Sequence, residues 1–289
     1  MAARTPLIVI VGETASGKSA LALALARRFN GEIISADSWT VYKGFDIGTA
    51  KPSVAEQAEV KHHLLDVAEP ANGFSAAEFK RLADKVIEDT SIRGKLPILV
   101  GGTGLYIDSI IYDYGFLPAG PHDKRQALDG LSLEVIQKLV GEAGISTEGI
   151  DVRNKRRLIR LLESDGERPT KQALRPDTLI IGVRLAKEEL EAQVTRRVEE
   201  MLDQGLQQEV QELSQRYGWD IEPMKGIGYR EWQNHFVGMQ SHAETREQII
   251  RASMQLAKKQ RTWFKRNKSI QWLKSSNEAT ELVQKFLSK

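Results

Sequence analysis

The segment IVIVGETASGKSALALALARRF, residues 8–29, combines three kinds of local sequence around one turn. The β-branched run IVIV favours a strand, and the Ala- and Leu-rich run after Ser19 favours a helix. Between them, residues 12–19 have the spacing of a phosphate-binding loop, whose backbone N–H groups and following helix N-terminus point at one oxyanion. Lys18 adds a positive charge and Ser19 a hydroxyl ligand for Mg²⁺. Such a loop binds phosphate groups but does not identify the molecule that carries them.

Length and composition are those of a globular protein with one large domain or two, since 41% of the 289 residues are hydrophobic and 28% are charged. The absence of cysteine excludes disulfides, thiolate zinc sites and a cysteine nucleophile. The net charge is only +2, so nucleic-acid binding would depend on local basic clusters. No apolar run approaches the roughly 18 residues that span a bilayer, and the amino-terminal apolar run leads directly into the phosphate loop. We expect a cytoplasmic protein that does not bind membranes.

Alternating strand and helix patterns predict an α/β fold with a parallel sheet. The predicted elements are strands near 7–11, 32–34, 97–100 and 179–183, helices near 17–29, 75–92, 104–112 and 243–266, and a late strand at 269–273. Turn-forming residues at 115–122 mark a boundary, and residues 123–175 are charged and helical in pattern. We therefore predict a discontinuous P-loop core, residues 1–114 and 177–289, with an all-helical insertion at 115–176. A long helical stretch at 187–216 fits either part, so the insertion could extend to about 216.

Two polar residues follow predicted strands. Asp37 comes after the second strand, at the sheet edge where open α/β folds bind ligands and where the phosphate loop also lies. A carboxylate there can hold Mg²⁺ or accept a proton, whereas the structural alternative is an Asx turn or a helix cap. Thr103 follows the third strand as a cap or a polar contact. A phosphate-loop kinase would need an acidic residue near this point, but the strand ends in Gly101 and Gly102.

Basic residues gather in two places. Arg153, Arg156, Arg157 and Arg160 recur at helical spacing within residues 151–164. Between Arg251 and Lys268, two aromatic residues, Trp263 and Phe264, lie among the basic residues Lys258, Lys259, Arg261, Lys265 and Arg266. Phosphate contacts with stackable rings suit RNA, while a solvated helix face and buried aromatic residues are the alternatives. The five histidines show no metal-ligand spacing.

Several motifs of this chain, and the order in which they occur, resemble those of the tRNA dimethylallyltransferase family, also called the tRNA isopentenyltransferase family. The motifs are GETASGKS, SADSWTVYKGFDIGTAKP, PILVGGTGLYI, RRLIRLLE, IGYRE and LAKKQRTWFKR. The resemblance runs from residue 8 to about 273, and its most specific part is residues 37–52, which phosphate-loop kinases do not share.

The resemblance implies a nucleotide-kinase-like core with a helical insertion over the tRNA. It implies transfer of a dimethylallyl group, with Mg²⁺, from dimethylallyl diphosphate to the exocyclic amine of the adenosine 3′ to the anticodon. The implied diphosphate-binding residues are Gly12, Thr14, Ala15, Ser16, Gly17, Lys18 and Ser19, with Ser19 also a metal ligand. The implied tRNA-binding residues are Asp37, Ser38, Trp39, Thr40, Thr103, Arg156, Arg157, Leu158, Ile159 and Arg160. Asp37 is the implied general base, Lys18 and Thr103 complete the catalytic set, and we add Arg125 as a candidate second clamp on the diphosphate.

Two residues depart from the family's usual loop. Glu13 stands where the family usually has Pro, and a carboxylate beside a diphosphate is unfavourable unless it points away or pairs with a cation. Ser19 replaces the usual Thr and keeps the hydroxyl. Two other functions remain as alternatives: a phosphate-loop kinase that uses ATP on a nucleotide or small metabolite, and a non-catalytic nucleotide-dependent RNA-binding module. A tRNA-sized substrate requires only one chain, so we expect a monomer.

Overall fold

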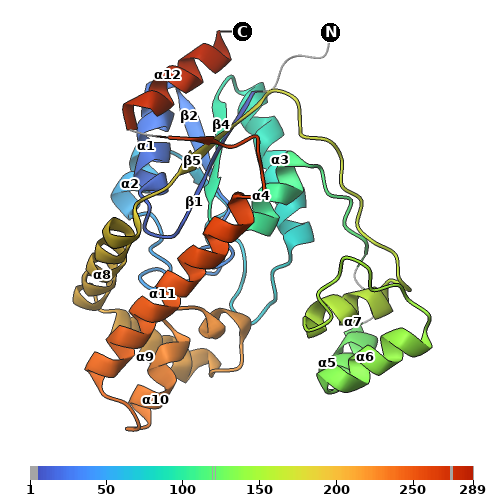
Figure 1. Cartoon of the computed structure of the whole chain (residues 1–289). Helices are drawn as coiled ribbons and strands as arrows, with labels where there is room; N and C mark the ends of the chain where they lie inside the picture. The colour runs from blue at the N-terminus through green and yellow to red at the C-terminus, as the bar shows by residue number, and fades with distance from the viewer. Residues whose placement is uncertain (1–5, 119, 121, 274–275, 289) are drawn as a thin grey trace. The chain divides into compact units, whose positions relative to one another are not determined.

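A computed structural model describes residues 6–118, 120, 122–273 and 276–288 (Figure 1). The chain divides into two compact units. The first unit combines the residues up to Ile111 with those from Leu174 onward, and the second unit is Tyr112–Ala173. Each unit has a hydrophobic core of its own.

The first unit is built on a six-stranded sheet in which every neighbouring pair is parallel. The strands, in the order in which they lie in the sheet, are β3 (His62–His63), β2 (Gly31–Ser35), β4 (Leu96–Gly101), β1 (Leu7–Gly12), β5 (Thr178–Val183) and β6 (Gln271–Trp272). All residues of β1 and β4 are buried, as expected for a parallel sheet covered by helices on both faces. Since β1 lies between β4 and β5, the phosphate loop begins near the centre of the carboxyl edge.

Helices cover both faces of this sheet. The helices of the first unit are α1 (Lys18–Arg28), α2 (Val54–Glu59), α3 (Ala76–Ile92), α4 (Gly104–Ile111), α8 (Lys187–Asp203), α9 (Leu206–Tyr217), α10 (Gln233–Phe236), α11 (His242–Phe264) and α12 (Ser276–Leu287). Side chains of α1 and α12 share one buried cluster with Ile8 and Ile10 of β1. Helices α3 and α4 lie together on the other side of the sheet (Figure 1).

A further hydrophobic cluster joins α8, α9 and α11 to the loop after β2. Phe45 from this loop is fully buried, and its ring centroid lies 4.9 Å from that of Tyr229. The residues between β2 and α2 are therefore held by helices that come some 150 residues later in the chain.

The second unit contains α5 (His122–Asp129), α6 (Leu133–Glu142) and α7 (Lys155–Glu163). Ile136 and Val140 of α6 pack with Leu158, Ile159 and Leu161 of α7. An isolated antiparallel bridge between Gly115 and Thr170 joins the two ends of the unit.

The predicted α/β phosphate-loop class is confirmed, and the predicted strands lie within about two residues of the observed ones. Strand β3 and helix α2 are additional to the prediction. The predicted helical stretch at 187–216 is two helices, because Gly205 adopts a left-handed conformation (φ 98°) between α8 and α9. Both helices belong to the first unit. Among the described helices, none has the length and apolar character that crossing a bilayer requires.

Candidate active site

The phosphate loop joins the end of β1 to the start of α1. Gly12 has no room for a side chain, since a Cβ there would lie 2.5 Å from the carbonyl oxygen of Val183. Gly17, the residue before α1, has φ 86°, a conformation that glycine adopts without strain. Lys18 folds back over the loop and donates to the carbonyl oxygen of Glu13 at 3.1 Å. The loop is thus shaped as an anion-binding turn at a helix N-terminus.

Lys18 lies in a buried and strongly charged environment. Burial and, after it, the nearby positive charge of Arg197 lower the pKa of Lys18 to about 8, although the negative charges of Asp37 and Glu13 act in the opposite direction. Neither Lys18 nor Arg197 forms an ion pair with a carboxylate among the described residues, so the two cations together are well suited to a multiply charged anion.

Asp37 and Thr103 meet where β2 and β4 end side by side. The Asp37 Oδ1 atom accepts the backbone N–H of Trp39 at 2.9 Å, so the Asx-turn alternative describes part of its role. Its Oδ2 atom accepts no hydrogen bond from the residues that the structure describes, and this oxygen is available to a ligand. Thr103 Oγ1 accepts the N–H of Ser38 at 3.1 Å and donates to Ser38 Oγ at 3.3 Å, which fixes the turn that carries Asp37.

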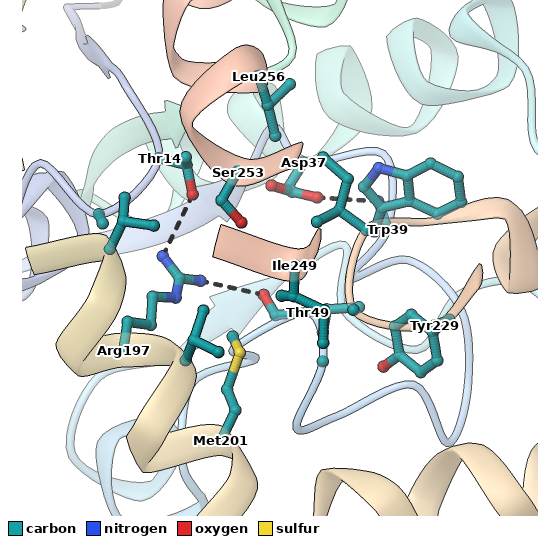
Figure 2. Close-up of a pocket in the computed structure, with 16 residues that line it drawn as sticks. Thr14, Asp37, Trp39, Thr49, Arg197, Met201, Tyr229, Ile249, Ser253 and Leu256 are labelled. Carbon is teal, nitrogen blue, oxygen red and sulfur yellow. Dashed lines mark hydrogen bonds between the residues drawn. The ribbon is translucent and has the colours of Figure 1, made fainter. Parts of the chain in front are cut away.

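Arg197 reaches this region from α8 (Figure 2). Its guanidinium donates to Thr14 Oγ1 and to the carbonyl oxygen of Thr49, both at 3.5 Å. Burial lowers the pKa of Arg197, and no described carboxylate forms an ion pair with it. A buried guanidinium with such long contacts retains donors for an anionic ligand.

Two adjoining pockets share Thr14, Asp37, Thr49, Arg197 and Leu256. One, of about 90 Å³, is mainly polar and includes Lys18, Ser19, Ser35, Thr40 and Gln260. The other, of about 80 Å³, has largely apolar walls and includes Trp39, Val194, Val198, Met201, Tyr229 and Ile249 (Figure 2). A polar pocket that contains Lys18 and Arg197 therefore adjoins a small apolar chamber, and Asp37 lines both.

The family model described as IPP transferase matches residues 40–267. The chain belongs to the IPP transferase family. It is 42% identical over 283 residues to a tRNA dimethylallyltransferase of Anoxybacillus flavithermus, covering 94% of this chain and 91% of that protein. It is 38% identical to a tRNA dimethylallyltransferase of Staphylococcus aureus, covering 96% and 95% of the two chains.

Solved structures give the same result. The fold is similar to that of the full-length tRNA isopentenylpyrophosphate transferase of Bacillus halodurans, with a TM-score of 0.77 and 33% identity over 98% of this chain and 97% of that one. It is also similar to a eukaryotic dimethylallyltransferase acting on tRNA, with a TM-score of 0.85 and 25% identity over 98% of this chain and 80% of that one.

In this IPP transferase, the first unit brings together the loop residues 12–19, Asp37, Trp39 and Thr103. Trp39 is half-buried and lines the apolar pocket. Thr40 is buried with its hydroxyl 3.0 Å from Ser35 Oγ, so its side chain points into the protein.

The other predicted site residues lie in the second unit, and several of them are buried or held by contacts within that unit. The guanidinium of Arg125 pairs with Asp129 at 3.3 Å and with Glu163 at 3.0 Å, so its charge is already neutralised by two carboxylates. Leu158 and Ile159 are fully buried in the core of this unit, which removes their side chains from any RNA contact. Arg160 is held by Glu163 and by the carbonyl oxygens of residues 117 and 118. Of the predicted α7 residues, Arg156 and Arg157 present exposed side chains.

Mg²⁺ fits the chemistry of the polar pocket. Ser19, at the second position of α1, and Asp37 both line this pocket, and each has a side chain with oxygen donors for a metal ion. Within the described residues, no group of three or more His, Cys, Asp or Glu side chains forms a protein-only metal site. Mg²⁺ commonly binds through one or two protein oxygens together with substrate phosphates and water, which is the donor set available here.

Arg197 and Gln260, which line these pockets, were not predicted from the sequence, nor was Glu209, which accepts the N–H of Gly48 and the hydroxyl of Tyr229 in the wall of the apolar pocket. Arg197 and Glu209 lie on the helical stretch whose place in the fold the sequence left open, and Gln260 lies in the basic cluster of α11. The sequence carries little signal for Arg197: it is one of several charged residues of α8, and only its place beside the buried positions Val194 and Val198 sets it apart.

Proposed function

We propose that the protein transfers the dimethylallyl group of dimethylallyl diphosphate to the exocyclic amine of the adenosine 3′ to the anticodon in tRNA. The observation that carries this proposal is the position of Asp37, which lines both the polar pocket beside Lys18 and Arg197 and the adjoining apolar chamber. A diphosphate group suits the polar pocket, and a five-carbon apolar tail attached to it suits the adjoining apolar chamber.

In the proposed reaction, the bond between the allylic carbon and the diphosphate oxygen breaks while a carbon–nitrogen bond to the adenine amine forms. Lys18, Arg197 and the loop N–H groups stabilise the negative charge that grows on the leaving diphosphate. The Asp37 carboxylate accepts the proton that the amine loses. The Ser19 hydroxyl would be a ligand for Mg²⁺, which would supply further stabilisation of the charge on the diphosphate. The products are diphosphate and the prenylated adenosine.

The RNA reaches this site through an anticodon loop, whose unstacked bases can turn out of the stack at modest cost. Arg156 and Arg157 on α7 supply positive charge for the phosphate backbone without reading bases. We further propose that one chain suffices for catalysis and that the enzyme works in the cytoplasm, where its tRNA substrate is.

A paired labelling experiment tests the function. The protein is incubated with tRNA and Mg²⁺, in one arm with dimethylallyl diphosphate labelled in the carbon chain and in the other with ATP labelled at the terminal phosphate. The proposal expects label in tRNA only from the prenyl donor, located at the nucleotide 3′ to the anticodon. Transfer from ATP alone would support the kinase alternative, and transfer from neither would support the RNA-binding module.

A further inference from the structure

The carboxylate of Glu13 is buried inside the phosphate loop, where only 2% of the residue is exposed. Arg261, from α11, binds both of its oxygens: Nε donates to Oε1, and Nη2 donates to Oε2 at 2.9 Å. Arg261 Nη2 also donates to the carbonyl oxygen of Leu185 at 3.3 Å. This two-pronged contact is the strongest geometry that arginine offers to a carboxylate.

Glu13 also belongs to the hydrogen bonds that shape the loop. Its carbonyl oxygen accepts the N–H of Ser16 at 3.2 Å and the Nζ of Lys18 at 3.1 Å. Its negative charge acts on Lys18, the loop's own cation. An unpaired carboxylate here would repel a diphosphate across a buried, low-dielectric distance, where charges interact more strongly than in water.

The neighbouring residue of α11 holds the next residue of the loop. Gln260 Oε1 accepts the N–H of Thr14 at 2.7 Å, and its Nε2 donates to the carbonyl oxygen of Gly102 at 3.1 Å. Consecutive residues of α11 therefore bind consecutive residues of the loop, which fixes the position of Glu13 relative to the end of β4.

We propose that Arg261 is a positioning residue that neutralises and holds Glu13, so that this phosphate loop, despite its carboxylate, accepts a diphosphate. The identity of the prenyl donor rests on the proposed function, whereas the effect of the Glu13–Arg261 ion pair on diphosphate affinity does not depend on that identity. Arg261, one of the basic residues of α11, would therefore serve the phosphate loop and not contact RNA.

Calorimetric binding of inorganic pyrophosphate, with Mg²⁺ and without tRNA, tests the proposal. Arg261→Met should weaken binding about tenfold or more, because the carboxylate is left buried and unpaired. Arg261→Lys, which restores a point charge, should fall between this variant and the wild type. The double variant Glu13→Gln/Arg261→Met should return to within about threefold of wild type, since no buried charge remains.

Lys187→Met is the matched control. Lys187 is an exposed cation that lines the same groove as Arg261, and among the described residues it forms no hydrogen bond or ion pair with the loop, so its removal should change pyrophosphate affinity less than about twofold. Thermal unfolding of every variant verifies folding. If Arg261→Met does not fold, the effect of Arg261→Lys on pyrophosphate affinity is measured in two backgrounds, the wild type and Glu13→Gln. The proposal expects a weaker effect in the Glu13→Gln background, because the carboxylate is then absent.

Unchanged pyrophosphate binding in Arg261→Met would overturn the inference. So would equal weakening in the single and double variants, because Arg261 would then act on the ligand directly. In the transfer assay, Arg261→Met should raise the KM for the prenyl donor about tenfold while kcat at saturating donor stays within about threefold. If the wild type binds pyrophosphate with the expected pattern but transfers no prenyl group, the proposed function fails and the ion-pair inference stands.

Discussion

Lys18 is a lysine whose charge state is set by its neighbours, because burial and Arg197 lower its pKa to about 8. In the proposed reaction the ammonium form binds diphosphate, and this form is lost as the pH rises through 8. We therefore predict that kcat/KM for the prenyl donor falls above pH 8, approaching tenfold per pH unit. Initial rates at low donor concentration between pH 6.5 and 9.5 measure this.

The Arg197→Gln variant provides the control for that profile. Removal of the guanidinium takes away the second-largest cause of the lowered Lys18 pKa, so the fall should move to higher pH even though overall activity drops. A fall that stays at the same pH in this variant would show that another group titrates.

Asp37 combines a structural and a chemical role in one side chain, and the two can be separated. In Asp37→Asn, the amide oxygen keeps the bond from the N–H of Trp39, but the side chain no longer accepts a proton. We predict a loss of at least about a hundredfold in kcat, with tRNA affinity within about threefold of wild type. Single-turnover transfer and filter binding measure the two quantities. Near-normal turnover would remove Asp37 from the role of base.

At the scale of elements, α9 holds the turn between β2 and α2 through one carboxylate. Glu209 accepts the N–H groups of Asp46, Ile47 and Gly48 at 2.8–3.1 Å and the Tyr229 hydroxyl at 2.7 Å. Gly48 and Tyr229 both line the apolar pocket. The position of this wall therefore depends on a residue about 160 positions later in the chain.

We predict that Glu209→Gln lowers the free energy of unfolding by about 1–3 kcal/mol, because an amide cannot accept all four donors. It should also raise the KM for the prenyl donor by loosening the pocket wall. Glu212→Gln, an exposed change on the same helix, is the control and should leave both quantities nearly unchanged. Denaturant unfolding and steady-state kinetics test this, and equal behaviour of the two variants would contradict it.

Local sequence was sufficient to predict most strands and helices of the sheet, because β1 and β4 are continuous apolar runs flanked by glycine and α3 begins with a capping box at Ser75. Strand β3 has only two residues and is defined by pairing with β2, so its sequence carries little periodicity. Asp37, adjacent to a strand end, could be placed at the site from the parallel topology, whereas Thr103 is assigned to it through the family resemblance. Arg197, Glu209 and Gln260 could not, since only the tertiary fold brings α8, α9 and α11 to that edge.

At the scale of the molecule, the two units have separate hydrophobic cores. Surface residues of the second unit can therefore be changed without disturbing the phosphate loop of the first. We predict that Arg156→Gln/Arg157→Gln weakens tRNA binding about tenfold and reduces the slope of log K against log salt by about 1–2, while pyrophosphate binding is unchanged. Lys138→Gln, an exposed change on α6, is the control. Filter binding at several salt concentrations measures the slope, and an unaltered slope would exclude these arginines from phosphate contact.

The central place of β1 in the sheet has a consequence for how the protein is made. Its neighbour β5 follows the whole second unit in the chain, so a nascent polypeptide on the ribosome exposes one unpaired edge of β1 until residues 178–183 have emerged. The guanidinium that neutralises the loop arrives later still, on α11. An unfinished chain therefore carries the phosphate loop without the cation that balances Glu13, and we expect its capacity to capture pyrophosphate to appear only when synthesis is nearly complete.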